Sequence, residues 1–170
     1  RQAGKYNMPV LFDMQDREYG YGLCDDYGLP KLEHALRECP DTIFIGHGPT
    51  FWAEISSDVP SDNRSGYPDG PIKPGGAVPR LMRKYPNLWA DISAGSGYNA
   101  MTRDPVFALE FLDEFQDRIM FGTDSCLRSD VNDVYRNVAF VRELREKKKL
   151  SNEALEKIEW KNCCRLLNLF

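Results

Sequence analysis

The sequence lacks long hydrophobic runs and any excess of basic side chains. Its longest apolar stretches are residues 8–12 and 43–46, far short of the roughly 18 residues that suggest a membrane span. Lysine and arginine number 22 against 26 acidic residues, giving a net charge of −4 and a pI near 5.3. Because nucleic-acid phosphates bind net basic faces, we expect a soluble protein with neither a membrane nor a nucleic acid as partner.

Paired cysteines are also missing. The chain has five cysteines, an odd number, and none of them belongs to a C-x-x-C pair. This spacing argues against a disulfide scaffold and against a structural zinc knot. We therefore expect free thiols, a reducing compartment and a cytoplasmic location. The five residues are Cys24, Cys39, Cys126, Cys163 and Cys164.

The first residues lack an initiator methionine and a signal-peptide pattern. Because an apolar run follows almost at once, we expect an N-terminal segment to precede Arg1 in a longer protein. Within its 170 residues the chain is 42% hydrophobic and 12% aromatic. These values are close to those of ordinary globular domains, so they argue against disorder or a fibre and favour one domain with a buried core.

Four short apolar segments have the character of buried strands. They begin at positions 8, 42, 88 and 119, at intervals of 34, 46 and 31 residues. Helical stripes follow or separate them, at residues 29–39, 78–85, 105–115 and 134–144, and Ser151 is expected to cap a last helix. A strand-helix unit needs roughly 30 residues, and repeated units imply parallel strands with helical crossovers. The predicted fold class is therefore α/β with parallel (β/α) repeats.

The longest interval contains an insertion at residues 48–75. This segment holds five of the eleven prolines and four of the thirteen glycines, and it shows neither a helical nor a strand period. Long loops without a period are usually functional or disordered. Because the segment follows a strand, we predict a long active-site loop at the carboxyl end of the sheet.

Three ionisable residues close the predicted strands: Asp13, His47 and Asp124. The carboxyl ends of parallel strands meet at one edge of an α/β fold, so side chains distant in sequence converge there. Carboxylate and imidazole form a ligand set suited to zinc or manganese. A carboxylate beside a metal-bound water can also accept its proton. We predict that these three residues surround one site.

The strand segments, with the residues that end them, form a recognisable pattern. They are residues 9–13, 42–48, 88–93 and 118–124, and the chain closes with Ile158-x-x-x-Asn162-x-x-Arg165-Leu166-Leu167. This pattern resembles the last four strands and the terminal helix of the amidohydrolase-related, TIM-barrel metal-dependent hydrolases. The resemblance implies that residues 1–170 form a single (β/α)4 unit, the second half of a (β/α)8 barrel.

The resemblance also implies roles for individual residues. Asp13, His47 and Asp124 would be metal ligands, and His47 and Asp124 would be catalytic, with Asp124 also shuttling a proton. The chain departs from the family pattern at two points. Asp13 stands where a histidine is usual, and the H-x-H motif of the first barrel strand is absent, because His34 and His47 are the only histidines. A complete binuclear site cannot come from these residues alone.

The function implied by the resemblance is that of a metal-dependent hydrolase or lyase. Its cofactor would be a divalent metal ion, with zinc expected ahead of manganese. Aromatic and guanidinium groups near the strand ends suit a small, flat, carboxylated or cyclic substrate. The predicted substrate-binding residues are Arg17, Trp52, Tyr98 and Arg103.

Other readings stay open. Four parallel strands alone leave two open edges, so the chain could be a catalytically inactive half-barrel, a decayed paralogue or a binding subunit that forms a homo-oligomer. Cys126 could act as a nucleophile if a cation such as Arg128 lowered its pKa. A doubly wound phosphate-binding domain is disfavoured, because Met14-Gln15-Asp16 follows the first strand in place of a glycine-rich turn.

Overall fold

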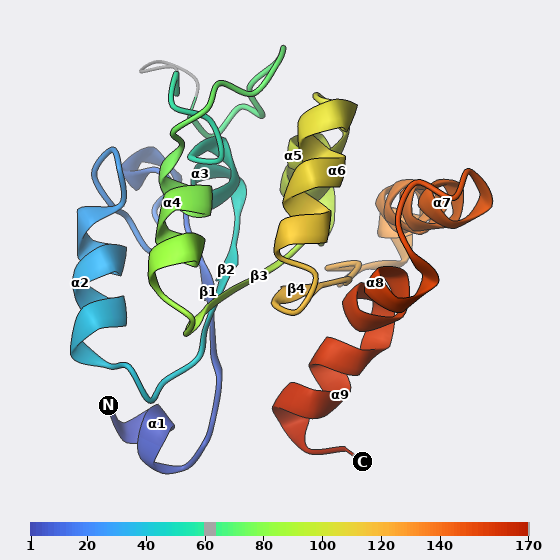
Figure 1. The fold of residues 1–170 in the computed structure, drawn as a ribbon. Helices are drawn as coiled ribbons and strands as arrows, with labels where there is room; N and C mark the ends of the chain where they lie inside the picture. The colour runs from blue at the N-terminus through green and yellow to red at the C-terminus, as the bar shows by residue number, and fades with distance from the viewer. Residues whose placement is uncertain (60–63, 170) are drawn as a thin grey trace. The chain divides into compact units, whose positions relative to one another are not determined.

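The computed structural model describes residues 1–59 and 64–169 (Figure 1). Four strands form one parallel sheet in the order β1-β2-β3-β4, with helices between them. The predicted α/β class is confirmed, and the topology is that of half a (β/α)8 barrel. The chain divides into two compact units, Arg1–Ala90 and Asp91–Phe170. The strands are β1 (Val10–Asp13), β2 (Phe44–His47), β3 (Leu88–Asp91) and β4 (Ile119–Met120).

Strands β1 and β2 pair in parallel beside a tightly packed position at Gly46. The two strands pair from Val10 opposite Phe44 to Asp13 opposite His47. A side chain at Gly46 would collide with the ring of Phe51, which lies fully buried in the helix that follows β2. Phe51 also meets Phe12 edge to face, with 5.9 Å between ring centroids. The first core therefore forms directly beneath the ends of these two strands.

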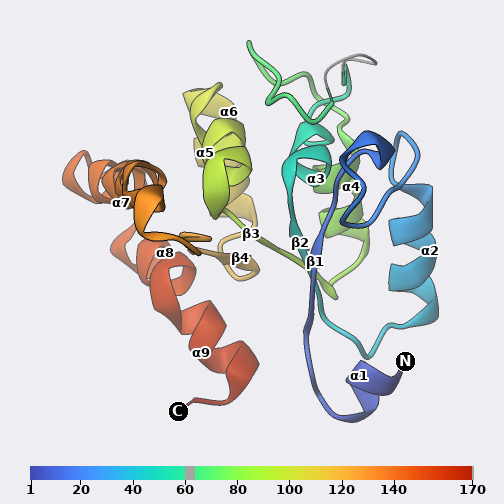
Figure 2. The ribbon, with the colours of Figure 1, turned by 180° about the vertical axis from the view of Figure 1, so that it is seen from behind.

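Helices α2 and α4 lie together on one side of β1 and β2 in both ribbon views (Figure 2). They bury Leu36 and Leu81, which carry the apolar stripes expected from the sequence. Proline at the start of α2 suits the first helical turn, and the Asp25 carboxylate caps it by accepting hydrogen bonds from the amides of Lys31 (3.1 Å) and Leu32 (2.8 Å). The helical segments of this unit are α1 (Gln2–Lys5), η1 (Arg17–Tyr19), α2 (Pro30–Glu38), α3 (Pro49–Ala53) and α4 (Ala77–Lys84).

The second unit packs its helices around β4 and the segment that follows β3. The Ile92 amide donates to the Met120 carbonyl at 2.9 Å, and the Phe121 amide donates to the Ile158 carbonyl at 2.8 Å. Asn162 lies buried in the last helical segment and donates to the carbonyl of Ile119 at 2.8 Å. The helices are α5 (Ala94–Thr102), α6 (Pro105–Glu114), η2 (Arg128–Asp130), α7 (Val131–Glu146), α8 (Asn152–Glu156), the π-helical turn η3 (Lys157–Lys161) and α9 (Asn162–Leu167).

Several local expectations differ from the structure. Residues 49–53, predicted as loop, form α3, and residues 94–102 form α5. The fourth strand is shorter than predicted, because the Phe121 amide bonds to Ile158 in place of a neighbouring strand. The predicted cap at Ser151 is present: its hydroxyl accepts from the Ala154 amide at 3.0 Å. Residues 60–63 of the predicted active-site loop lie outside the described residues.

Membrane-spanning segments and disulfides are the next features of the structure to consider. Within the described residues, no helix combines the length and the apolar character that crossing a membrane needs. All five cysteines are free thiols in the structure.

Glu33 joins α2 to α4 and provides a test of the packing between these helices. Its carboxylate accepts hydrogen bonds from Lys84 Nζ (2.7 Å), Arg80 Nη1 (3.1 Å) and the Tyr85 hydroxyl (3.1 Å). These bonds, with Lys84 contributing most, lower the pKa of Glu33 from 4.5 to about 2. The charged carboxylate is therefore stabilised in the folded state.

We expect Glu33→Gln to lower the free energy of unfolding near neutral pH by about 1 kcal/mol, a modest loss because the ion pairs are partly exposed. The pKa of Glu33 in the folded protein lies below its ordinary value. The contribution of Glu33 to the free energy of unfolding is therefore fully present above that ordinary pKa and disappears as the pH falls toward about 2. Urea unfolding across this range measures it. Glu38→Gln, on the same helix in exposed pairs with Arg1 and Arg37, is the control. A gap between wild type and Glu33→Gln that is the same at every pH would contradict the assignment.

Candidate active site

Asp13 and His47 are brought together at the carboxyl ends of β1 and β2. They are opposite residues of the parallel pairing, so their strands lie about 4.8 Å apart and their side chains leave the sheet on the same face. Both are half-buried. The Met14 amide donates to the His47 carbonyl at 2.9 Å and continues the pairing one residue further. A carboxylate and an imidazole thus stand next to each other on a fixed backbone.

The Asp13 carboxylate is held in place by two neighbours. Gln15 Nε2 donates to both of its oxygens, at 3.1 and 3.2 Å, and Gln15 is itself buried. On the other side lies Gly48, where a side chain would collide with Asp13 Oδ1 and with the Met14 backbone. The backbone at Gly48 has φ +98°, a conformation that favours glycine. The carboxylate is therefore oriented by the protein groups around it.

A buried ion pair fastens the segment after β2 to this region. Arg64 Nη2 lies 2.9 Å from Glu54 Oε1, and both side chains are nearly inaccessible, with 6% and 4% exposed. Arg64 Nη1 also donates to the Asp25 carbonyl at 2.8 Å, and the guanidinium lies over the Tyr27 ring. Burial raises the pKa of Glu54, and the charge of Arg64 opposes that rise.

Neighbouring contacts add to this anchor. Ser65 Oγ donates to Asp16 Oδ2 at 2.7 Å, and the Lys73 amide donates to Ser56 Oγ at 2.8 Å. These bonds fasten the predicted active-site loop at its base and near its middle. Neither Glu54 nor Arg64 belongs to a motif that the sequence makes recognisable. The only signals are an acidic residue two positions after the aromatic pair of α3 and one arginine in a proline-rich segment, and both are weak.

The second unit gathers polar groups after β3 and β4. Ser93 Oγ donates to Asp91 Oδ2 at 3.0 Å, and a side chain at Gly122 would come within 3.1 Å of Ser93 Cβ. These contacts place the segments after the two strands against each other. Ser96, in the first turn of α5, is buried, and its hydroxyl finds no hydrogen-bond partner among the described residues.

Asp124 lies four residues beyond the end of β4, further from the strand than the sequence suggested. It is exposed and has φ +57°, a left-handed conformation that aspartate adopts more readily than most residues. Cys126 Sγ lies 3.4 Å from the Asp124 carbonyl, and the thiol is exposed. Asp124 belongs to the second unit, whereas Asp13 and His47 belong to the first. The convergence of all three residues stays a prediction.

The predicted substrate-binding residues have different surroundings. Arg17 is exposed on η1, shortly after β1. Trp52 is only 2% exposed and packs edge to face on Phe51, so it contributes to the core. Tyr98 lies in the middle of α5, and Arg103 ends that helix, about 13 Å along the helix axis from its start. Both residues thus belong to a helix and its end, and their contact with a substrate stays a prediction.

A sheet of successive parallel strands, with ionisable side chains at the strand ends, defines an α/β protein of the (β/α)-barrel class. The family model described as amidohydrolase matches residues 25–169, and the chain belongs to this family. The resemblance seen in the sequence is thereby confirmed. A search of the curated proteins finds no match. Membership supports a hydrolase-type enzyme, and the family is generally metal-dependent.

The donor chemistry of the candidate site suits a divalent ion, but the set is small. His47 offers an imidazole and Asp13 an oriented carboxylate at paired positions, and zinc accepts both types of ligand. Across residues 1–59 and 64–169, no group of three or more histidine, cysteine, aspartate or glutamate side chains could hold a metal ion. The described residues therefore supply part of a ligand set.

The close approach at Gly48 gives a direct test of the geometry around Asp13. We expect Gly48→Ala to lower the free energy of unfolding by about 3 kcal/mol, because the new methyl group overlaps the Asp13 carboxylate and the backbone is strained. Gly70→Ala is the matched control. Gly70 also has positive φ, +78°, but no atom lies within 4 Å of the place that a Cβ would take there, so only the backbone cost of about 1 kcal/mol remains. Equal losses for the two variants in urea unfolding would show that Asp13 is not confined in this way.

Proposed function

We propose that this chain is part of an amidohydrolase-type enzyme that acts on a small carboxylated or cyclic substrate, and that its catalytic residues lie at the strand ends. The observation that carries the proposal is the pairing of Asp13 with His47 at the ends of adjacent strands, in a chain of the amidohydrolase family. Side chains at this edge of parallel (β/α) folds are the ones that such enzymes use for chemistry. Hydrolysis is the favoured reaction, with decarboxylation or another lyase reaction as the alternative within the same family.

The chemistry of the side chains suggests a division of roles. Hydrolysis of an amide or ester needs a group that polarises the carbonyl and a base that takes a proton from water. The His47 imidazole can polarise the carbonyl by donating a hydrogen bond to its oxygen. Asp124, exposed after β4, is proposed to accept the proton of water and return it to the leaving group. Gln15 fixes the position of the Asp13 carboxylate, which suits a metal ligand.

The proposal includes a divalent metal ion, with zinc preferred by the donor set. Asp13, His47 and Asp124 would hold it, and when bound a zinc ion supplies a water of lowered pKa. The exposed guanidinium of Arg17 would pair with the carboxylate of the substrate. A cytoplasmic location, and association with a second copy along the open sheet edges, remain part of the proposal.

Zinc binding can be tested with the two histidines of the chain. We expect zinc to be retained after dialysis by the wild-type chain and lost in His47→Ala, because imidazole is the strongest neutral ligand available. His34→Ala is the control, since His34 is exposed and contacts Arg37 at 2.9 Å. Metal content by mass spectrometry measures the outcome. Equal zinc in His47→Ala and in wild type would remove His47 from the ligand set.

The role of Asp124 is tested by turnover. A panel of cyclic amides, aryl lactones and aromatic carboxylic acids, with zinc or manganese added, covers hydrolysis and decarboxylation. We expect Asp124→Asn to lower kcat by at least about a hundredfold, the lower end of general acid-base contributions, and to leave the unfolding curve unchanged.

Asp113→Asn, on the exposed side of α6, is the control for the loss of a carboxylate. A fully active Asp124→Asn enzyme would discard the proposed mechanism. Absence of turnover with every class of compound, together with absence of bound metal, would favour the catalytically inactive half-barrel.

A further inference from the structure

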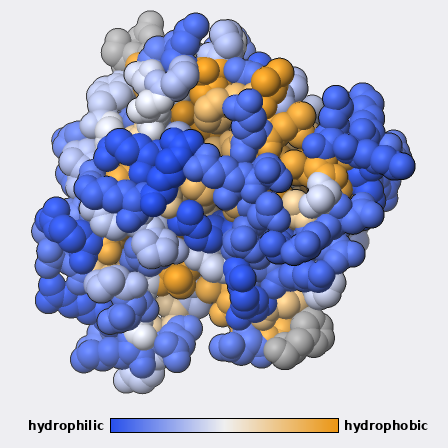
Figure 3. Space-filling model, in the orientation of Figure 1, coloured by the Kyte–Doolittle hydropathy of each residue, from blue (hydrophilic) through white to orange (hydrophobic). Residues whose placement is uncertain are grey.

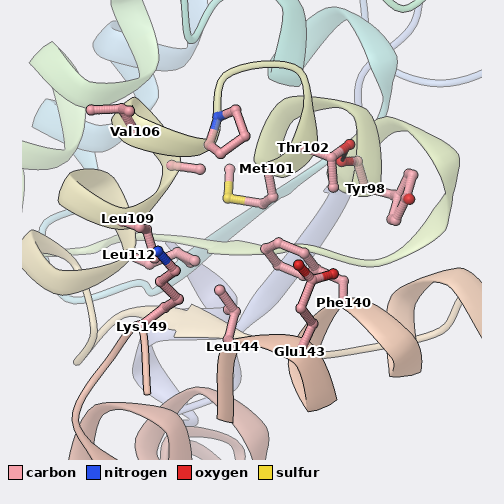
Figure 4. Close-up of a pocket in the computed structure, with 12 residues that line it drawn as sticks. Tyr98, Met101, Thr102, Val106, Leu109, Leu112, Phe140, Glu143, Leu144 and Lys149 are labelled. Carbon is pink, nitrogen blue, oxygen red and sulfur yellow. Dashed lines mark hydrogen bonds between the residues drawn. The ribbon is translucent and has the colours of Figure 1, made fainter. Parts of the chain in front are cut away.

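A cavity of about 370 Å³ lies within the second unit, between α5, α6 and α7 (Figure 4). Its volume falls within the roughly 300–1,000 Å³ typical of small-molecule sites. Each of the three helices contributes apolar side chains to the walls, and the methionine adds a flexible surface that adapts to different shapes. The residues that matter here are Met101 from α5, Leu109 and Leu112 from α6, and Phe140 and Leu144 from α7.

The apolar walls continue to the surface. Figure 3 shows hydrophobic residues gathered over α6 and toward α7. Val106, at the start of α6, lines the cavity and is 71% exposed. An exposed apolar surface that leads into a cavity is unfavourable in water unless a ligand covers it. The cavity is therefore reachable by an apolar molecule from solution.

Two charged side chains border the cavity, and one of them, Glu143, forms an ion pair. Glu143 Oε1 accepts from Lys147 Nζ at 2.6 Å. Lys149 also lines the cavity, and no ion pair joins it to an acidic side chain in the part of the chain that the structure describes. In Figure 4 the amino group of Lys149 is drawn on the Leu109–Leu112 side, and Glu143 is drawn beside Phe140. One side of an apolar cavity thus carries an unbalanced positive charge.

We propose that this cavity binds a monocarboxylate with an unbranched apolar body of about ten carbon atoms, a size that suits its volume. The apolar body lies against Leu112, Phe140 and Leu144, and the carboxylate pairs with Lys149 Nζ. An ammonium ligand would lack a partner of opposite charge, because Glu143 is already paired with Lys147. The site is independent of the strand ends and of the proposed hydrolase activity.

Decanoate, kept below its micelle concentration, is the probe for the full chain. Titration calorimetry is expected to show saturable binding to one site, with decanol, which lacks the charge, bound about fivefold more weakly. In Lys149→Met the affinity for decanoate should fall about fivefold and the affinity for decanol should not change. Lys148→Met is the matched control: it removes the same charge one residue away, from a side chain that does not line the cavity.

A second variant tests the location. Leu109→Trp fills the cavity and should abolish binding of both compounds, provided that its circular dichroism matches that of the wild type. If this variant does not fold, Lys149→Met still decides the question. The proposal is overturned by uptake of decanoate that does not saturate, by equal affinities for decanoate and decanol, or by unchanged decanoate affinity in Lys149→Met.

Discussion

The candidate site depends on how closely the backbone approaches its neighbours at two glycines. Gly46 leaves room for the ring of Phe51, and Gly48 leaves room for the Asp13 carboxylate. A side chain at Gly46 would push Phe51 and α3 away from β2, and a side chain at Gly48 would disturb the pairing of β2 with the end of β1. Because that pairing places Asp13 opposite His47, the arrangement of the ionisable groups follows from packing. A site built in this way exists before any ligand arrives, which is a general requirement of catalysis by preorganised groups.

The segment after β2 is fixed by a buried ion pair in addition to buried apolar side chains such as Phe51, Ile55 and Ile72. Moving the charges of Glu54 and Arg64 out of water is unfavourable, and only close pairing and further hydrogen bonds compensate it. Arg64 meets these conditions in part, through the ion pair with Glu54, the Asp25 carbonyl and the Tyr27 ring, while its Nε and Nη2 form no hydrogen bond among the described residues. Removing one partner would leave a buried charge without compensation. The described part of this segment is thus fastened near the strand ends, although it is rich in proline and glycine.

Sequence patterns predicted the features that depend on local periodicity. The apolar runs ending at Asp13 and His47 indicated two buried strands, and parallel pairing of these strands follows from the length of the crossover. Helix α5 was missed, because Gly95 and Gly97 have low helix propensity. Tertiary packing stabilises the helix there, since Gly97 packs directly on the backbone of Ile92. The Glu54–Arg64 pair could not be predicted, because it joins residues ten positions apart through a loop without a period.

The bonding of the two aspartates bears on which of them is suited to transfer a proton. A group that holds a ligand must keep its position, whereas a proton acceptor must change its hydrogen bonding in every turnover. Both oxygens of Asp13 already accept from the Gln15 amide, so protonating Asp13 would disrupt at least one of these bonds. Asp124 is exposed to solvent, so a proton that it accepts can pass on to bulk water. In the proposed mechanism, Asp13 therefore serves only as a ligand, whereas Asp124 is the carboxylate that also transfers the proton.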